Sequence, residues 1–242
     1  MITADQIKQF HDVGYFILPQ AFPAAEIDTL REHIDTFASA HKTRLKETGT
    51  EGISRANEIS FTINLAAQDP EIMKFVAQDT FVELTSALLK SDISLYWDQS
   101  VYKEPETAKD FPWHQDTGYV PTDPAEYVTC WLALDDVPVE SGSIWVIPGS
   151  HHQGMVEHKQ TDIGWQVYFG DDPGVPVPLQ KGGMVVFSSL LFHRSGPNLS
   201  NHTRKGYVIQ YSVAHAKNAK TGEPFNRIVI ARDGKPALHQ PA

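Results

Sequence analysis

Cysteine and long hydrophobic runs are both scarce in this 242-residue chain. With Cys130 as the only cysteine, a disulfide framework and a thiolate metal cluster are excluded. The apolar neighbours of Cys130 predict a buried strand, in which a free thiol serves as a small apolar side chain. No apolar stretch is long enough to cross a bilayer, and the first residues show no basic region followed by an apolar run. We therefore expect a cytoplasmic protein.

Positive charge is scarce as well. The chain has 20 lysines and arginines against 30 aspartates and glutamates, a formal net charge of -10. This balance disfavours nucleic acid and anionic membrane surfaces as partners, because both are polyanionic. An acyl-CoA would need a basic surface, and no strong cluster of lysine or arginine is present. We expect a small-molecule substrate, and no obligate protein partner is evident.

Apolar residues make up 41% of the chain and are arranged in two ways. Residues 1–92 are predicted to be mostly helical, because apolar side chains recur at helical spacing over residues 24–41. Shorter helices are expected at 69–77 and 80–90, whereas residues 49–66 have no clear pattern. From about residue 93 to 215 the pattern is β-rich, with glycine and proline between the segments. The expected strands are 93–102, 127–137, 143–147, 184–188 and 206–213.

Many short strands after a helical start predict an antiparallel sandwich or barrel supported by helices. There is no internal repeat and no convincing linker. The chain is therefore predicted to be one domain over residues 1–242, with an all-β core and flanking helices.

The segment Trp113-His114-Gln115-Asp116 is the first candidate for chemistry. Residues two apart in a strand project to the same face, so His114 and Asp116 are expected to point together. An imidazole and a carboxylate on one face are two ligands of the two-histidine, one-carboxylate triad of non-haem iron oxygenases. On its own, however, a His-x-Asp pattern arises by chance in many proteins.

A second segment contains His193, Ser195 and, nine residues further on, Arg204. His193 follows an apolar strand, and a turn after Gly196 can return Arg204 to its side. Arginine suits a carboxylate ligand because its planar guanidinium donates two parallel hydrogen bonds and stays charged when buried. Taken alone, Arg204 is better explained as a surface residue at the start of a strand.

Taken together, these motifs resemble the phytanoyl-CoA dioxygenase family. The resemblance rests on His114-x-Asp116 and on His193 followed by Arg204. The segments 142–151 and 10–19 are also similar to parts of that family, so the match runs from about residue 5 to residue 213. Four ordered motifs with compatible spacing are far more specific than any one of them.

The resemblance implies a double-stranded β-helix (a cupin-like jelly roll) with Fe(II) held by His114, Asp116 and His193. It also implies that Arg204, helped by Ser195, binds the distal carboxylate of the cosubstrate 2-oxoglutarate, and that O2 is the oxidant. Further cosubstrate contacts are expected from residues that share a strand face in pairs, namely Gln99 with Lys103 and Thr129 with Trp131.

The implied activity is oxidation of a small organic metabolite, hydroxylation above all, with release of succinate and CO2. The retained carboxylate at Asp116 favours oxygen insertion over halogenation. Desaturation, epoxidation and ring chemistry by the same centre stay open. One alternative is a cupin-like hydrolase or isomerase that does not use 2-oxoglutarate, and another is a binding module without activity.

The remaining candidates are three histidines and three loops. His151, His152 and His158 are expected in a surface loop, because no carboxylate lies at a fitting spacing. The segments 51–66, 118–127 and 153–175 are candidate lids over a substrate pocket.

Overall fold

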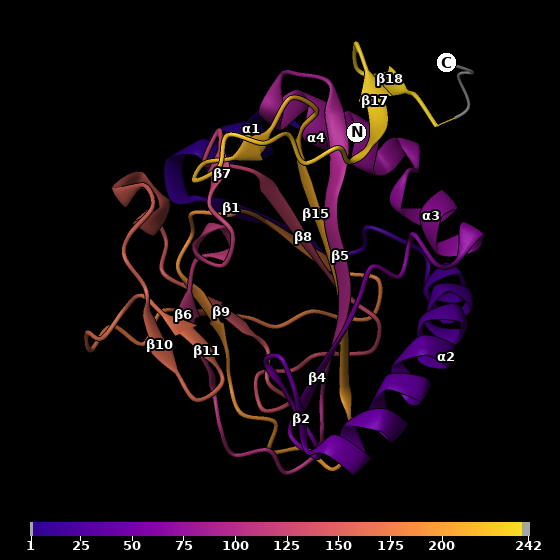
Figure 1. The fold of residues 1–242 in the computed structure, drawn as a ribbon, viewed down its shortest axis with the longest axis vertical. Coiled ribbons are helices and arrows are strands. Elements are labelled where there is room, and N and C mark those ends of the chain that lie inside the picture. Colours follow the sequence, from indigo (N-terminus) through magenta and orange to yellow (C-terminus); the bar gives the residue numbers. More distant parts are fainter. Residues whose placement is uncertain (1, 239–242) are drawn as a thin grey trace.

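The computed structural model describes residues 2–238, and two antiparallel sheets form its core (Figure 1). The larger sheet has the strand order β1-β13-β8-β15-β5-β4-β3-β2, and β17 pairs with both β5 and β18. Its strands are β1 (Tyr15–Leu18), β2 (Thr50–Glu51), β3 (Ser54–Arg55), β4 (Ile59–Ile63), β5 (Ile93–Lys103), β8 (Val128–Ala133), β13 (Met184–Ser188), β15 (Arg204–Val213), β17 (Ile228–Arg232) and β18 (Lys235–Pro236).

The smaller sheet has the order β12-β9-β14-β6. It consists of β6 (Phe111–His114), β9 (Ile144–Val146), β12 (Val175–Val177) and β14 (His193–Ser195). Two short pairs lie outside the two sheets, β10 (Lys159–Thr161) with β11 (Gly164–Gln166) and β7 (Thr122–Asp123) with β16 (Lys217–Asn218). Short 3-10 helices occur at Asp116–Gly118 (η1) and Ser150–Gln153 (η2).

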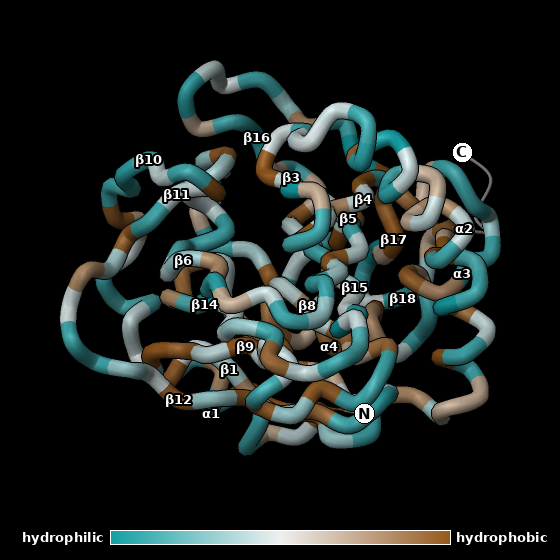
Figure 2. The backbone as a smooth tube through the Cα atoms, turned by 90° about the horizontal axis from the view of Figure 1, so that it is seen from below, coloured by the Kyte–Doolittle hydropathy of each residue, from teal (hydrophilic) through white to brown (hydrophobic). Residues whose placement is uncertain are grey.

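Four α-helices cover the outer face of the larger sheet: α1 (Ala4–Val13), α2 (Ala24–Thr48), α3 (Pro70–Val76) and α4 (Asp79–Leu89). In Figure 1 the long helix α2 runs beside the sheet, on the side away from β6 and β9. Figure 2 shows hydrophobic stretches around interior strands such as β5 and β9, and mainly hydrophilic stretches in the peripheral loops.

The alternation of side chains along β8 produces two separate hydrophobic cores. Cys130 and Leu132 pack with the helices in one core, whereas Trp131 and Ala133 pack with the smaller sheet in the other. Successive side chains of a strand point to opposite faces, so a strand covered on both sides is apolar throughout. The candidate site lies in the second core, between the two sheets.

Helix α2 extends two turns beyond the predicted end at residue 41. Ala38, His41 and Leu45 continue the buried face at helical spacing, and Gly49, with φ +76°, follows the last turn. The sequence prediction ended too early because His41 is a polar residue at a core position, where it is only 3% exposed.

The all-β core with flanking helices is confirmed, and most expected strands end within two residues of the observed ones. One exception is 127–137, where β8 ends at Ala133. Residues 49–66, which had no clear pattern, contain the β2–β3 hairpin and β4. Beyond residue 215, β17 pairs with Ile93–Leu95 of β5 and adds a strand to the larger sheet.

The single domain over residues 1–242 stays a prediction, and residue 1 and residues 239–242 lie outside the described part. Within residues 2–238, no helix combines the length and the hydrophobicity needed to cross a membrane.

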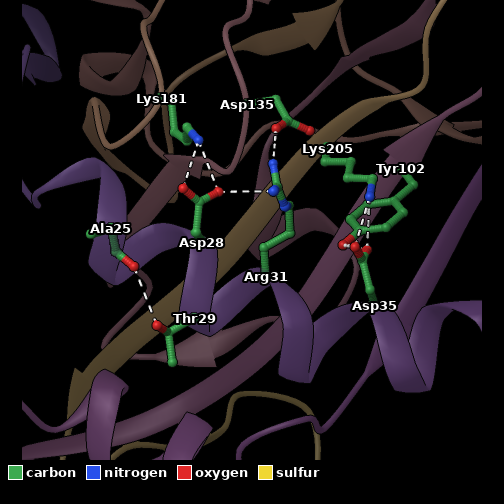
Figure 3. Close-up of polar contacts among 9 residues, drawn as sticks. All are labelled: Ala25, Asp28, Thr29, Arg31, Asp35, Tyr102, Asp135, Lys181 and Lys205. Carbon is green, nitrogen blue, oxygen red and sulfur yellow. Dashed lines mark hydrogen bonds and ion pairs between the residues drawn. The ribbon is translucent and has the colours of Figure 1, made fainter.

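A row of charged side chains fastens α2 to the larger sheet (Figure 3). Asp28 pairs with Lys181 at 2.8 Å and with Arg31, which also contacts Asp135. One turn further along, Asp35 accepts hydrogen bonds from Tyr102 on β5 at 2.7 Å and from Lys205 on β15 at 2.8 Å. The spacing of Asp28, Arg31 and Asp35 places all three on the face of α2 that meets the sheet.

We expect the substitution Asp35→Ala to lower the free energy of unfolding by about 1–2 kcal/mol, because the buried Tyr102 hydroxyl loses its acceptor and Lys205 loses its counter-ion. Urea denaturation followed by circular dichroism measures this change. Glu32→Ala is the matched control, since Glu32 is an exposed residue of the same helix, and it should change stability by less than about 0.5 kcal/mol. Equal effects of the two substitutions would contradict a fastening role for Asp35.

Candidate metal centre

Three residues from neighbouring elements converge between the two sheets. His114 ends β6, His193 begins β14, and the pairing of these strands places the two histidines opposite each other. Their ring centroids are 4.1 Å apart. One ligand atom from each of His114, Asp116 and His193 lies within 4.8 Å of the others, so the three could hold one metal ion.

The sequence prediction that His114 and Asp116 project together is met, but not within one strand. β6 ends at His114, and Asp116 opens the short helix η1. Gln115 between them keeps extended dihedral angles, φ -109° and ψ 140°, so the alternation continues for one more residue. Asp116 Oδ1 consequently lies 3.7 Å from His114 Nε2 and 3.5 Å from His193 Nε2.

Backbone carbonyls set the tautomer of both imidazoles. His114 Nδ1 is 2.8 Å from the Pro112 carbonyl, and His193 Nδ1 is 3.0 Å from the Leu191 carbonyl. Because a carbonyl only accepts, each Nδ1 carries the proton, and each Nε2 offers its lone pair to the shared space. Burial, together with the nearby His193, lowers the pKa of His114 to about 3, which keeps it neutral.

Thr129 holds the carboxylate of Asp116 in place. Its hydroxyl donates to Asp116 Oδ2 at 2.6 Å and accepts from the Gln210 amide at 3.4 Å. Burial alone would raise the pKa of Asp116, but His193, His114 and the Thr129 hydroxyl outweigh it and lower the pKa to about 2. Asp116 is therefore ionised at neutral pH, with Oδ1 directed toward the two histidines.

Gln115 fixes the segment around the triad from the other side. Its side-chain amide donates to the carbonyls of Gly154 and Leu190, both at 2.7 Å. Its backbone N–H donates to His158 Nε2 at 2.9 Å. The sequence reasoning did not single out Gln115, and a glutamine between two candidate ligands gives no signal of this role.

The expectation of a surface loop for His151, His152 and His158 is wrong for His151 and only partly right for His158. His151 is 8% exposed, and its Nε2 lies 3.0 Å from the His11 carbonyl. His158 is half-buried beside Gln115, while His152 is exposed. The η2 segment packs against the end of α1, a tertiary contact that spacing along the sequence does not reveal.

Arg204 is fully buried at the start of β15. Its Nη1 donates to the Val101 carbonyl at 2.9 Å, and its guanidinium carbon lies 5.3 Å from the centre of the Trp131 ring. Within the described residues, its Nε and Nη2 have no hydrogen-bond partner. Burial lowers the pKa of Arg204 to about 10, so the side chain stays charged at neutral pH.

A buried cation with two idle donors is costly unless a ligand completes it. A carboxylate is the group whose geometry fits two adjacent guanidinium N–H donors. Arg204 therefore indicates an anionic ligand at this place.

A small chamber of about 50 Å³ adjoins the triad. Of the residues predicted to contact a cosubstrate, it is lined by Gln99, Thr129, Trp131 and Ser195. Lys103 shares the strand face of Gln99 but does not line the chamber. Its ammonium donates to the carbonyls of Gly196, at 2.6 Å, and Lys109, at 3.0 Å. Burial, and then the charge of Arg204, lower the pKa of Lys103 to about 7.

A larger cavity of about 410 Å³ opens on the other side of His114 and Asp116. Two of the three candidate lids contribute to its walls, residues 51–66 and 118–127. Residues from the third, 153–175, line a different groove of about 530 Å³. Arg204 does not line the small chamber either, but it contacts Val101 and Trp131 in the chamber wall. The triad thus adjoins both this chamber and a larger cavity bounded by loops.

Known proteins are similar to this chain in sequence. The family model of phytanoyl-CoA dioxygenase (PhyH) matches residues 10–206. A phytanoyl-CoA dioxygenase of Arabidopsis thaliana is 25% identical over 86% of this chain and 88% of its own length. The phytanoyl-CoA dioxygenase domain-containing protein 1 of Bos taurus is 31% identical over 86% and 89%, respectively.

Solved structures of other proteins have a similar fold. EvdO2 from Micromonospora carbonacea var. aurantiaca, in complex with 2-oxoglutarate, superposes with a TM-score of 0.72 at 24% identity, over 94% of this chain and 97% of its own. The epimerase SnoN, in complex with Fe3+, alpha-ketoglutarate and nogalamycin RO, gives a TM-score of 0.69 at 21% identity, over 95% and 96%. Because the family model covers most of the chain, this protein belongs to the phytanoyl-CoA dioxygenase (PhyH) family.

Proposed function

We propose that this protein is a non-haem Fe(II)- and 2-oxoglutarate-dependent dioxygenase that oxidises, and above all hydroxylates, a small organic molecule. Membership of the PhyH family supports the oxygenase class. The observation that carries the proposal is the buried guanidinium of Arg204, which keeps two unpaired donors and contacts Val101 and Trp131 in the wall of the chamber that adjoins the triad.

The donor set fits iron. His114, His193 and Asp116 offer two neutral imidazole nitrogens and one ionised carboxylate, a combination typical of non-haem Fe(II) oxygenases. The three ligands come from one side of the shared space, which leaves the opposite side for a cosubstrate and oxygen. When bound, iron with 2-oxoglutarate and O2 supplies the oxidising power, and 2-oxoglutarate is converted to succinate and CO2.

The surrounding residues bind 2-oxoglutarate and orient the metal ligands. Arg204, with Ser195, holds the distal carboxylate of 2-oxoglutarate, and Trp131 and Gln99 form walls of the same chamber. Thr129 directs Asp116 toward the metal. Lys103 acts from outside the chamber lining, where one hydrogen bond holds the turn after Ser195, at Gly196, and the other holds Lys109 ahead of β6.

In the alternative, a hydrolase or isomerase that does not use 2-oxoglutarate, Arg204 has no anionic ligand to bind. Such an enzyme needs no buried cation beside its metal, and an unpaired buried cation destabilises the fold.

Anaerobic addition of Fe(II) and then 2-oxoglutarate to metal-free protein is expected to produce a weak visible charge-transfer band, because the keto acid chelates the iron. The visible spectrum measures it, and His193→Ala should abolish it by removing one of three ligands. Iron binding without the band would favour the enzyme that does not use 2-oxoglutarate, and failure to bind iron would favour a binding module.

The substitution Arg204→Met should weaken 2-oxoglutarate binding by roughly a hundredfold while Fe(II) still binds, because two charge-assisted hydrogen bonds are lost. Anaerobic titration of the same band measures the affinity. Lys205→Met is the control, since Lys205 is the adjacent cation of β15 and pairs with Asp35 at 2.8 Å, near the helices. Comparable 2-oxoglutarate affinity in wild type and Arg204→Met would exclude the assigned role of Arg204.

The substitution Thr129→Val should weaken Fe(II) binding about 10-fold or more, because residues that orient a metal ligand typically contribute 10- to 100-fold to affinity. Competition with a chelating dye under anaerobic conditions measures the affinity. Thr85→Val is the matched control, since Thr85 is equally buried but bonds to the Phe81 carbonyl within α4. An unchanged Fe(II) affinity in Thr129→Val would show that Asp116 needs no support from Thr129.

A further inference from the structure

The walls of the larger cavity restrict the charge of the substrate. Within the part of the chain that the structure describes, no lysine or arginine lines this cavity. Its acidic residues are Asp116, assigned above to the metal, and Glu51 on the β2–β3 hairpin. Two arginines contact residues of the wall without lining the cavity: Arg227 lies 5.7 Å from the centre of the Tyr96 ring, and Arg55 donates to the carbonyls of Gly52 and Ser54. A phosphate or carboxylate inside this cavity would therefore lie near Glu51, with no lysine or arginine in the wall itself.

The rest of the wall is largely aromatic. Six aromatic side chains line the cavity, namely Phe61, Tyr96, Trp97, Phe111, Tyr119 and Tyr127. Flat rings offer large apolar contact area, and their faces attract cations. Gln99 and Gln210 add neutral hydrogen-bonding groups close to the metal. This wall suits a substrate with a ring-containing body that is neutral or positively charged.

An incomplete polar pair lies where α2 and the hairpin meet the cavity. His41 is 97% buried, and its Nδ1 lies 3.1 Å from the Thr62 hydroxyl. Its Nε2 is 3.3 Å from Glu51 Oε2, but the atom has no hydrogen bond within residues 2–238. A buried polar atom without a partner destabilises the protein unless a ligand supplies one.

One kind of ligand suits both His41 Nε2 and the Glu51 carboxylate. Glu51 is a carboxylate and only accepts hydrogen bonds, and His41 Nε2 accepts as well when Nδ1 donates to Thr62. A group that donates several hydrogen bonds and carries positive charge satisfies both at once. A protonated amine meets this description.

We propose that the larger cavity accepts a ring-containing molecule with a protonated amino group, and that His41 and Glu51 bind this group beside the β2–β3 hairpin. The inference rests on the proposed function, because it takes the cavity as the substrate site of the oxygenase.

The position of the pair also sets the reach of the substrate. His41 contacts β4 through Thr62, whereas Asp116 contacts β8 through Thr129. Three strand spacings separate β4 from β8 in the order β8-β15-β5-β4. At about 4.8 Å each, the strands that carry the two contacts are on the order of 14 Å apart. The substrate therefore needs a body large enough to extend from the β2–β3 hairpin toward the triad.

Three indole compounds of matched shape test the charge preference: tryptamine (cationic), N-acetyltryptamine (neutral) and 3-indolepropionate (anionic). Their binding to full-length protein is measured by ligand-observed NMR, with 2-oxoglutarate and with diamagnetic Zn(II) in place of Fe(II). The variants are Glu51→Gln and, as a control of equal charge change, Glu47→Gln. Both glutamates are exposed, so both variants are expected to fold.

In wild type, tryptamine should bind roughly fivefold or more tightly than 3-indolepropionate, with N-acetyltryptamine between them, because a half-exposed carboxylate attracts a cation modestly and repels an anion. Glu51→Gln should remove this preference, and Glu47→Gln should keep it. Equal binding of the three compounds, tighter binding of the anion, no binding of any compound, or an unchanged preference in Glu51→Gln would overturn the inference.

The visible band described above keeps the two proposals apart. A band in wild type without any charge preference leaves the oxygenase in place and removes the amine site. A charge preference that depends on Glu51, in a protein without the band, supports the amine site and removes the oxygenase.

Discussion

The pairing of β14 with β6 is the contact on which the site depends. It places His193 directly opposite His114 on the smaller sheet, although 78 positions of sequence separate them. Asp116 reaches the same space only because β6 ends where it does and the chain turns into η1. The larger sheet completes the arrangement through Thr129 on β8, which holds the carboxylate. The two sheets thus bring the distant His193 to the segment His114-x-Asp116 and complete one ligand set.

Buried charge is the second constraint, and the buried ionic groups differ in how completely they are hydrogen-bonded. Asp116 is supported by a hydroxyl and two imidazoles, and Lys103 is satisfied by two backbone carbonyls. Among these groups, Arg204 alone has nitrogen atoms without any hydrogen bond. Since desolvating a charge without partners is strongly unfavourable, an incomplete buried cation is retained where a ligand completes it. The same reasoning applies, more weakly, to His41 Nε2.

Local pattern was sufficient for much of the fold. Helical spacing predicted α2 and its neighbours, and alternation with glycine and proline punctuation predicted most long strands. It failed at His41, where a polar residue occupies a core position of α2, and in the hairpin β2–β3, whose strands are two residues long. Such short strands carry too little alternation to be recognised. β17 was also missed, because its pairing with β5 is formed across more than a hundred residues.

The sequence by itself determined the kind of chemistry, because ligand type and spacing are properties of the chain. Four ordered motifs, among them His114-x-Asp116 and His193 followed by Arg204, resembled the phytanoyl-CoA dioxygenase family, and that resemblance implied a non-haem iron oxygenase before any geometry was considered. Strand parity placed Thr129 with Trp131. Only the tertiary structure decided how these residues act. It showed that Thr129 supports Asp116, that Lys103 lies outside the chamber lining and that His41 meets Glu51 at the edge of the larger cavity. These contacts join side chains from different strands and helices, and their distances follow from packing rather than from position along the chain.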